Sequence, residues 1–339
     1  KEYDGTSNVN FKNSAILKGL IKEEEVALDR SQAIGAFANA DVGTAKTVNL
    51  FGLAITGADA GNYTLIHPTT KASITAKELT VSGIIAPDKE YDGATTATLK
   101  GTANLVGAIS GDDVTLNATQ AAGAFANADL GTGKTVTISG LAITGADAGN
   151  YTLTQPTTTA TITAKELTVS GITASDKDYD GTTSATLVST STASLVGVIG
   201  DDEVTLNVTQ AAGAFANANA GTGKTVTISG LTISGADAGN YTLAQPTTTA
   251  TITISVKTLE VSGITASDKE YDGGTTATLL GTATTTLVGI IGDDQVTLNV
   301  TQAAGSFANA DVGTGKTVTI SGLTISGADA ANYSLAQPT

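Results

Sequence analysis

The residues with the clearest chemical potential in this chain of 339 residues are acidic pairs that recur after glycine. Calcium takes about six to eight oxygen ligands, carboxylates among them, and binds many extracellular modules. The Gly-Asp-Asp sequence also fits an ordinary turn, in which the Asp side chain bonds its own backbone. Calcium is therefore the one candidate cofactor. The candidate ligands are Asp112, Asp113, Asp201, Asp202, Asp293 and Asp294.

A lysine and an asparagine that recur in the repeats could form a covalent cross-link. Some bacterial surface domains join a Lys and an Asn side chain by an isopeptide bond, with help from a buried acid. Here Lys134 opens one predicted strand, and Asn150 follows 16 residues later on a neighbouring strand. The alternative is a lysine at a turn and an asparagine in a left-handed backbone conformation. An intact mass distinguishes the two, because each such bond releases one ammonia.

Asparagine also heads a short motif that matches the N-glycosylation sequon. The motif is Asn-Tyr followed by Thr or Ser, and it is common by chance in a sequence this rich in threonine. Glycosylation is one hypothesis for these positions, and a structural asparagine is the other. The asparagines are Asn62, Asn150, Asn240 and Asn332.

The composition excludes several classes of function. There is no Cys, Met or Trp, so thiol catalysis, disulfides and zinc–thiolate sites are impossible. The single histidine, His67, stands where three other repeats carry Gln, and we expect no enzyme. With 17 Lys plus Arg against 32 Asp plus Glu, the net charge of −15 argues against nucleic acid. No apolar run approaches the roughly 18–20 residues that a membrane helix needs.

Internal repetition determines the predicted architecture. The tripeptide Tyr-Asp-Gly begins at Tyr3, Tyr91, Tyr179 and Tyr271, with spacings of 88, 88 and 92 residues. Asn-Tyr and Gly-Ala/Ser-Phe-Ala-Asn-Ala recur with it. We expect these aromatic residues to build the cores, because one ring can bury about 150–250 Å². The remaining members of the set are Tyr63, Tyr151, Tyr241, Tyr333, Phe37, Phe125, Phe215 and Phe307.

Between these motifs, apolar residues alternate with threonine and serine, as Val136 and Ile138 do, which is typical of half-buried strands. The sequence therefore predicts an all-β tandem array of four small antiparallel domains. An immunoglobulin-like sandwich is preferred, and a β-grasp-like fold is the alternative. Because no flexible linker separates the repeats, we expect an elongated rod. The predicted domains are residues 1–76, 77–164, 165–255 and 256–339.

The first and last repeats differ from the middle two. Repeat 1 lacks the Leu-Thr-Val-Ser strand that opens the others, and repeat 4 lacks the Thr-Ala-Thr-Ile-Thr strand that closes its neighbours. Exposed strand edges attract partners. We expect either a longer run of such repeats or strands supplied by neighbouring chains.

The ordered motifs resemble a known repeat. Lys-Glu/Asp-Tyr-Asp-Gly, Gly-Asp-Asp-x-Val-Thr-Leu, Gly-Thr-Gly-Lys-Thr-Val and Gly-Ala-Asp-Ala-Gly-Asn-Tyr are similar to the YDG-type repeat of bacterial surface adhesins, including large filamentous-haemagglutinin-like proteins. Repeat 1 departs from the pattern, with Glu24 and Glu25 at the acidic pair and Ala45 in place of a glycine. The resemblance implies an extracellular, non-enzymatic protein at the bacterial cell surface.

The expected function is a structural stalk or fibre of an adhesin or surface filament that spaces or connects cells. Its partners would be further copies of the repeat, without nucleic acid or membrane insertion. One alternative is an adhesive module that binds surface glycans or proteins. The other is a subunit that assembles into filaments by end-to-end strand donation. Exposed rings of Tyr91 and Tyr151 would favour the binding module, and buried rings would favour the stalk.

Overall fold

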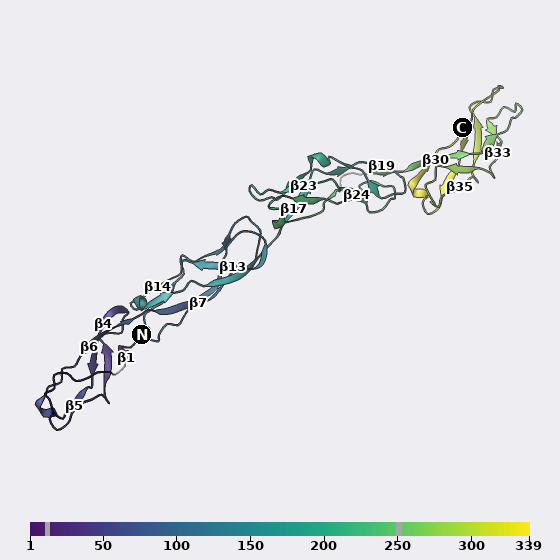
Figure 1. The fold of residues 1–339 in the computed structure, drawn as a ribbon. Helices are drawn as coiled ribbons and strands as arrows, with labels where there is room; N and C mark the ends of the chain where they lie inside the picture. Colours follow the sequence, from purple (N-terminus) through teal and green to yellow (C-terminus); the bar gives the residue numbers. More distant parts are fainter. Residues whose placement is uncertain (11–13, 249–252) are drawn as a thin grey trace. The chain divides into compact units, whose positions relative to one another are not determined.

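The computed structural model describes residues 1–10, 14–248 and 253–339. The chain divides into two compact units, residues 1–164 and 165–339, and each unit holds two repeats (Figure 1). Helices within the described ranges are single 3-10 turns, and none has the length or apolar character to span a membrane. The prediction of an all-β tandem array is confirmed.

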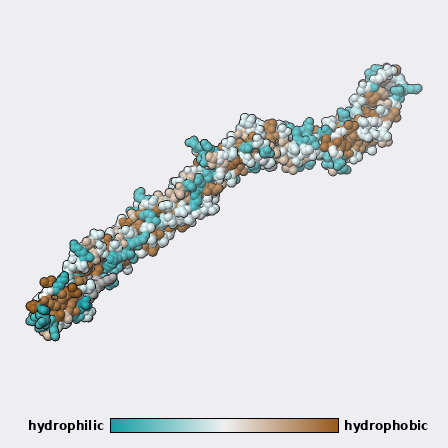
Figure 2. All heavy atoms as spheres, viewed as in Figure 1, coloured by the Kyte–Doolittle hydropathy of each residue, from teal (hydrophilic) through white to brown (hydrophobic). Residues whose placement is uncertain are grey.

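Repeat 1 forms an antiparallel sheet and a separate two-stranded ribbon. Its elements are β1 (Asn8–Val9), β2 (Ala27–Asp29), β3 (Ile34–Phe37), β4 (Gly43–Phe51), β5 (Ala54–Thr56), η1 (Ala60–Asn62) and β6 (Thr69–Ile74). The sheet has the order β1-β3-β4-β6, and β2 pairs with β5. Figure 2 shows an apolar patch over repeat 1 at the end that carries β5. Ile16, Ile21 and Ile66 are exposed large hydrophobic residues of this repeat.

Repeat 2 is the most complete of the four. Its elements are β7 (Lys77–Ile85), β8 (Lys89–Glu90), β9 (Thr96–Ala97), β10 (Lys100–Val106), β11 (Thr115–Asn117), β12 (Ala122–Phe125), β13 (Gly131–Ser139), β14 (Ala142–Thr144), η2 (Ala148–Asn150), β15 (Tyr151–Leu153) and β16 (Thr157–Thr163). The main sheet has the order β8-β16-β13-β12-β9, and a smaller one has the order β10-β7-β15. Side chains of the two sheets, including Val81 and Ile138, share one apolar cluster.

Repeat 3 follows the same plan in shorter strands. Its elements are β17 (Lys165–Ser170), β18 (Thr173–Ala174), β19 (Lys177–Asp178), β20 (Ser184–Ala185), β21 (Leu187–Val188), η3 (Thr190–Thr192), β22 (Ser194–Val196), β23 (Thr205–Asn207), β24 (Ala212–Phe215), β25 (Val226–Ser229), β26 (Thr232–Ser234), η4 (Ala238–Asn240), β27 (Tyr241–Leu243), β28 (Thr247–Thr248) and β29 (Ile254–Ser255). Part of its predicted closing strand, residues 249–252, lies outside the described residues.

Repeat 4 has the opening strand but no counterpart of β16 among its described residues. Its elements are β30 (Lys257–Ser262), β31 (Thr265–Ala266), β32 (Thr276–Ala277), β33 (Leu279–Leu280), β34 (Thr286–Val288), β35 (Thr297–Asn299), β36 (Ala304–Phe307), β37 (Val318–Ser321), β38 (Thr324–Ser326), η5 (Ala330–Asn332) and β39 (Tyr333–Leu335). Its largest sheets have the orders β34-β30-β39 and β32-β36-β37.

Most strand pairs are antiparallel, as expected, but repeats 2 and 3 each contain two parallel pairs. In repeat 2, β7 pairs in parallel with β15, and β8 pairs in parallel with β16. Repeat 3 repeats both pairings, and repeat 4 has the first, between β30 and β39. The long connections between these strands make parallel pairing possible, which a short hairpin cannot do.

Candidate functional site

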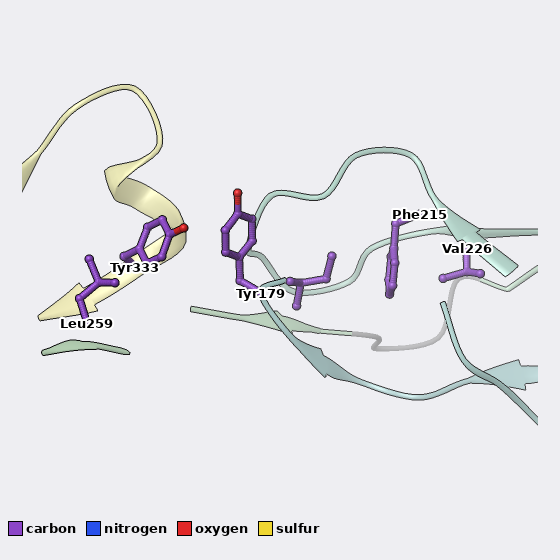
Figure 3. Packing of buried hydrophobic residues seen from close by; sticks show 6 residues of the cluster. Tyr179, Phe215, Val226, Leu259 and Tyr333 are labelled. Carbon is purple, nitrogen blue, oxygen red and sulfur yellow. The ribbon is translucent and has the colours of Figure 1, made fainter. Parts of the chain in front are cut away.

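Tyrosines from adjacent repeats meet at the boundary between repeats 1 and 2, and again between repeats 3 and 4. The rings of Tyr3 and Tyr151 lie edge to face, with centroids 5.3 Å apart and planes at 78°. Tyr179 and Tyr333 repeat this arrangement at 5.3 Å and 74° (Figure 3). Such geometry places the positive edge of one ring against the negative face of the other. The two boundaries are therefore built in the same way.

At each of these two boundaries, one aspartate accepts hydrogen bonds from both tyrosine hydroxyl groups. In unit 1, Tyr3 and Tyr151 donate hydrogen bonds to Oδ2 of Asp112, at 2.9 and 2.6 Å. The Tyr151 hydroxyl oxygen also accepts a bond from the backbone N–H of Ile109 at 3.0 Å. Hydrogen bonds to a charged acceptor are stronger than neutral ones. We call this group of two tyrosines and one aspartate the tyrosine clasp.

The clasp of unit 2 has the same bonds. Tyr179 and Tyr333 donate to Oδ2 of Asp294 at 2.8 and 2.5 Å, and the N–H of Ile291 donates to the Tyr333 hydroxyl at 2.9 Å. The first tyrosine belongs to the earlier repeat, and the second tyrosine and the aspartate belong to the later one. Each clasp thus joins two neighbouring repeats.

Each residue of the Tyr-Asp-Gly motif has its own structural role. Tyr3 supplies the ring. Asp4 holds the turn, because its carboxylate pairs with Lys1 Nζ at 2.6 Å and accepts the N–H of Thr6 at 2.9 Å. Gly5 has φ +76°, and a Cβ there would lie 3.3 Å from Cγ2 of Ile109 in the next repeat. The positive φ of the turn therefore favours glycine, and a Cβ at this position would also crowd the Ile109 side chain.

An asparagine makes a second bond across each boundary. Oδ1 of Asn150 accepts the backbone N–H of Val42 in repeat 1, at 2.9 Å. In unit 2, Oδ1 of Asn332 accepts the N–H of Ala220 in repeat 3, also at 2.9 Å. Both asparagines are buried, so these bonds satisfy amides that water does not reach easily.

The apolar cores continue through the clasps. One cluster joins Tyr3, Phe37, Val48 and Ile74 of repeat 1 to Leu79 and Tyr151 of repeat 2. Figure 3 shows its equivalent in unit 2, where Tyr179 lies between Tyr333 with Leu259 on one side and Phe215 with Val226 on the other. The aromatic residues therefore fill the cores, as expected, and the tyrosines also connect them, which the sequence did not reveal.

The clasps alter the acidity of their tyrosines. Burial, and then the hydrogen bond to Asp112, raise the pKa of Tyr3 to about 12. Burial and the bond to Asp294 likewise raise the pKa of Tyr179 and of Tyr333 to about 12. The hydroxyls therefore stay protonated and act as donors throughout the neutral range.

The aspartate that bonds the tyrosine hydroxyl is not the same member of the acidic pair in every repeat. The clasp uses the first aspartate of its pair in repeat 2, Asp112, and the second in repeat 4, Asp294. In repeat 3, Asp202 accepts the Tyr241 hydroxyl at 2.5 Å. Each of these acids precedes its tyrosine by 39 residues, and that constant separation could have identified them.

The other acids of the pairs serve the local turns or face solvent. Asp113 accepts the N–H of Ala146 at 3.1 Å, whereas Asp201 and Asp293 are exposed. Within the described ranges, no group of three or more His, Asp or Glu side chains is placed to hold a metal ion. Calcium binding at these residues stays a prediction.

The predicted isopeptide pair is not brought together. Lys134 Nζ donates to Oδ1 of Asn127 and to the backbone oxygen of Asp129, which fixes it in its own loop. Asn150 instead accepts the backbone N–H of Val42 in repeat 1. The pair was inferred from a short separation in sequence, and strand β13 carries the two residues apart.

Glycosylation is wrong for three of the four asparagines. The exposed fractions of Asn150, Asn240 and Asn332 are 6%, 8% and 5%, and a buried side chain cannot carry a glycan. Asn62 is exposed, and its modification stays a prediction. Asn150 and Asn332 are buried where two repeats meet, and each accepts a backbone N–H of the preceding repeat, from Val42 and Ala220.

Three aromatic residues depart from the expected burial. Tyr63 and Phe307 are half-buried, and Tyr271 is 70% exposed. Tyr63 belongs to repeat 1, where no described strand corresponds to β7. Tyr271 and Phe307 belong to repeat 4, where no described strand corresponds to β16. The other nine members of the aromatic set are buried: Tyr3, Phe37, Tyr91, Phe125, Tyr151, Tyr179, Phe215, Tyr241 and Tyr333.

Comparison with known families identifies the repeated module. The model of the YDG domain matches residues 1–72, 75–160, 163–250 and 255–339. No curated protein matches the chain.

Proposed function

The chain belongs to the YDG domain family, with four copies in tandem, and from this premise we propose that it is a non-enzymatic, load-bearing stalk segment of a bacterial adhesin or surface filament. Under this proposal it is extracellular, and its partners are further YDG repeats in the same chain or in neighbouring subunits. The single observation that carries the proposal is that the first strand of a repeat and its last strand each pair in parallel with another strand of the same repeat.

This pairing places the strands in shear when the chain is pulled from its ends. In repeat 2, tension enters at Lys77 in β7 and leaves after Thr163 in β16. The force at Lys77 pulls β7 towards its N-terminal end, along its partner β15. The force after Thr163 pulls β16 towards its C-terminal end, along its partner β8. The two parallel ladders lie along the load, so their hydrogen bonds must break together rather than one after another. Repeat 3 has the same two ladders.

The tyrosine clasps support the same function. Each clasp joins consecutive repeats through a shared apolar cluster and charge-assisted hydrogen bonds, at a point where the chain passes between repeats. A boundary of this kind transmits load between repeats better than a flexible linker. Tyr91 and Tyr151 are both buried, which favours a stalk over a module that displays these rings to a ligand.

Single-molecule force spectroscopy tests the proposal. Pulled from its ends, each repeat of about 88 residues is expected to unfold separately and to release on the order of 300 Å of chain, less its folded length. Because the chain has no cysteine, Thr80→Cys together with Val106→Cys provides unique handles for the control. These two residues face each other across β7 and β10, so pulling on them opens that ladder bond by bond.

We expect the rupture force to be at least twofold higher from the ends than from these handles. Equal forces in the two geometries would contradict a load-bearing role. Saturable binding of the intact chain to a surface glycan would instead favour the adhesive module.

A further inference from the structure

Each repeat carries one Asp-Gly dipeptide, within the Tyr-Asp-Gly turn. Both residues are exposed to solvent in all four repeats. Glycine has no Cβ to shield its main-chain nitrogen, so this nitrogen can approach the preceding carboxyl group closely. The dipeptide therefore combines an electrophilic carbon with an accessible nucleophile and with water. The four aspartates are Asp4, Asp92, Asp180 and Asp272.

An aspartate followed by glycine can lose water and close to a succinimide. The main-chain nitrogen of glycine attacks Cγ of aspartate and forms a C–N bond, and one carboxyl oxygen leaves as water with the carboxyl proton and the amide proton. Water then adds to one of the ring carbonyls and breaks its bond to nitrogen. Addition at Cγ restores aspartate, whereas addition at the main-chain carbonyl gives isoaspartate, whose backbone is one carbon longer.

A lysine holds the reactive carboxylate in the ionised form. In repeat 2, Lys89 Nζ lies 2.6 Å from Oδ1 of Asp92, and the N–H of Ala94 donates to the same oxygen at 2.9 Å. The lysine is itself held in place, because Nζ donates to the backbone oxygens of Ala94 and Thr96 at 2.7 and 3.1 Å. It also lies 5.8 Å from the centroid of the Phe125 ring. We call the lysine, the aspartate and the N–H that bonds its Oδ1 the lysine clamp.

The clamp recurs in all four repeats. The lysine stands three residues before the aspartate each time, and the N–H two residues after the aspartate donates to Oδ1 at 2.9 Å. The lysine side chains are 17–23% exposed, whereas the aspartates are 53–63% exposed. The other three pairs are Lys1–Asp4 at 2.6 Å, Lys177–Asp180 at 2.6 Å and Lys269–Asp272 at 2.7 Å.

The clamp opposes ring closure through charge. The succinimide forms from the neutral carboxyl group, because a protonated oxygen leaves as water far more easily than an ionised one. A cation beside the carboxylate favours the ionised form, and the bond to Lys89 lowers the pKa of Asp92. The succinimide carries no negative charge, so closing the ring also gives up the charge-assisted bonds of the clamp.

Isoaspartate at this position would disturb the contact between repeats. A Cβ added at Gly5 would lie 3.3 Å from Cγ2 of Ile109 in the next repeat, and a Cβ added at Gly181 would lie 2.9 Å from Cγ2 of Ile291. The extra backbone carbon would stand between the clasp tyrosine and this closely packed glycine, so the two could not both keep their positions. A long-lived boundary therefore needs an aspartate that does not isomerise.

We propose that the four Asp-Gly dipeptides are sites of succinimide formation and isomerisation, and that the lysine of each clamp is a positioning residue that suppresses this reaction. The lysine thus sets the chemical lifetime of the turn, and in repeats 1 and 3 it also sets the lifetime of the tyrosine clasp. This inference does not depend on the stalk function, because it rests on contacts within each turn.

Ageing of the whole chain at neutral pH tests the proposal, with peptide mapping that separates aspartate, succinimide and isoaspartate at each site. Lys89→Met should raise the rate of isoaspartate formation at Asp92 by about twofold to fivefold. The other three sites of the same chain should keep their rates. The matched control is Lys100→Met, which removes an exposed lysine of the same repeat and should change none of the rates. Lys177→Met repeats the test at Asp180.

Two further measurements separate protection by charge from simple loosening of the turn. Lys89→Arg keeps a cation and should restore the low rate of the parent chain. The dependence of the rate on pH gives the second measurement. In the parent chain the rate at Asp92 rises as acid protonates its carboxyl group, and in Lys89→Met the same curve should lie at higher pH. A lysine that only held the turn would raise the rate at every pH without moving the curve.

Four results would overturn the proposal. They are an unchanged rate in Lys89→Met, a rate in Lys89→Arg as high as in Lys89→Met, and a pH curve that does not move. The fourth is a rate in the parent chain equal to that of a free peptide with the sequence of residues 89–97, in which no fold holds the lysine in place.

Discussion

Repeats 2 and 4 contain the same hexapeptide in two different states. Gly-Thr-Gly-Lys-Thr-Val spans residues 131–136 and 313–318. In repeat 2 it belongs to β13, which begins at Gly131, whereas in repeat 4 the strand begins only at Val318. The difference is the neighbour, since β16 pairs with the first copy and no described strand pairs with the second. Strand formation here depends on a partner, as expected for β-structure.

The cores of the two repeats differ for the same reason. Phe125 and Val136 are buried in repeat 2, and their counterparts Phe307 and Val318 are half-buried in repeat 4. The closing strand therefore completes the core as well as the sheet. The comparison also extends to the first tyrosine, which is buried as Tyr91 in repeat 2 and exposed as Tyr271 in repeat 4.

The largest expected effect comes from making repeat 2 resemble repeat 4. Ile162→Ala removes the side chain that closes the core, and it should destabilise repeat 2 by about 2–5 kcal/mol. Hydrogen exchange of the β13 amides measures this loss. The matched control, Thr159→Ala on the exposed face of the same strand, should stay within about 0.5 kcal/mol. Unchanged protection in the isoleucine variant would mean that β16 holds the core without it.

The second prediction separates two adjacent acids of repeat 4. Asp294→Ala leaves two buried tyrosine hydroxyls without their acceptor and should cost about 2–3 kcal/mol. Asp293→Ala changes an exposed side chain and should cost about 0.5 kcal/mol or less. The Ile291 amide, which bonds the Tyr333 hydroxyl, reports the loss in hydrogen exchange. Equal effects of the two substitutions would show that the clasp does not stabilise the boundary.

The third prediction concerns alkaline pH. The pKa of Tyr3 is about 12 in the folded chain and about 10 in the unfolded chain. The contribution of the Tyr3 hydroxyl is therefore fully present below about pH 10 and is lost as the pH rises from about 10 to 12, by on the order of 2 kcal/mol. Denaturant unfolding at pH 9 and pH 12 measures the change. Tyr3→Phe keeps the ring but cannot ionise, so a pH dependence as steep as that of the parent chain would argue against this cause.

The smallest effect is expected at the turn of the Tyr-Asp-Gly motif, which repeats 2 and 4 share. The Lys89–Asp92 and Lys269–Asp272 pairs measure 2.6 and 2.7 Å, and both aspartates are more than half exposed. Asp92→Asn should cost about 0.2–1 kcal/mol, and Asp272→Asn should destabilise repeat 4 in the same direction and by no more than this.

The pH dependence of these pairs has the opposite sign to that of the clasp. The bond to Lys89 lowers the pKa of Asp92, so its small contribution is present above pH 4 and disappears on further acidification. Denaturant unfolding of both variants at pH 7 and pH 3 checks this. A much larger loss in repeat 2 than in repeat 4 would indicate that the turn depends on the closing strand.

Much of the fold was predictable because its signals are local or periodic. Alternation of Val136 and Ile138 with threonine indicates a strand wherever a partner is present, and the constant spacing of Tyr-Asp-Gly indicates a repeated domain. The clasp was not predicted, because Tyr3 and Tyr151 belong to different repeats and lie far apart in sequence. Adjacent aspartates look alike in sequence, so only their hydrogen bonds distinguish Asp294 from Asp293.

The amino-acid sequence alone determined the all-β class, the four repeats and the exclusion of thiol chemistry, since each follows from composition and short-range pattern. The tertiary structure alone decided which tyrosines meet, which aspartate joins them, and where an identical hexapeptide becomes a strand. The physical reason is that β-ladders and ring contacts are formed between segments, so their outcome depends on which neighbour lies beside them.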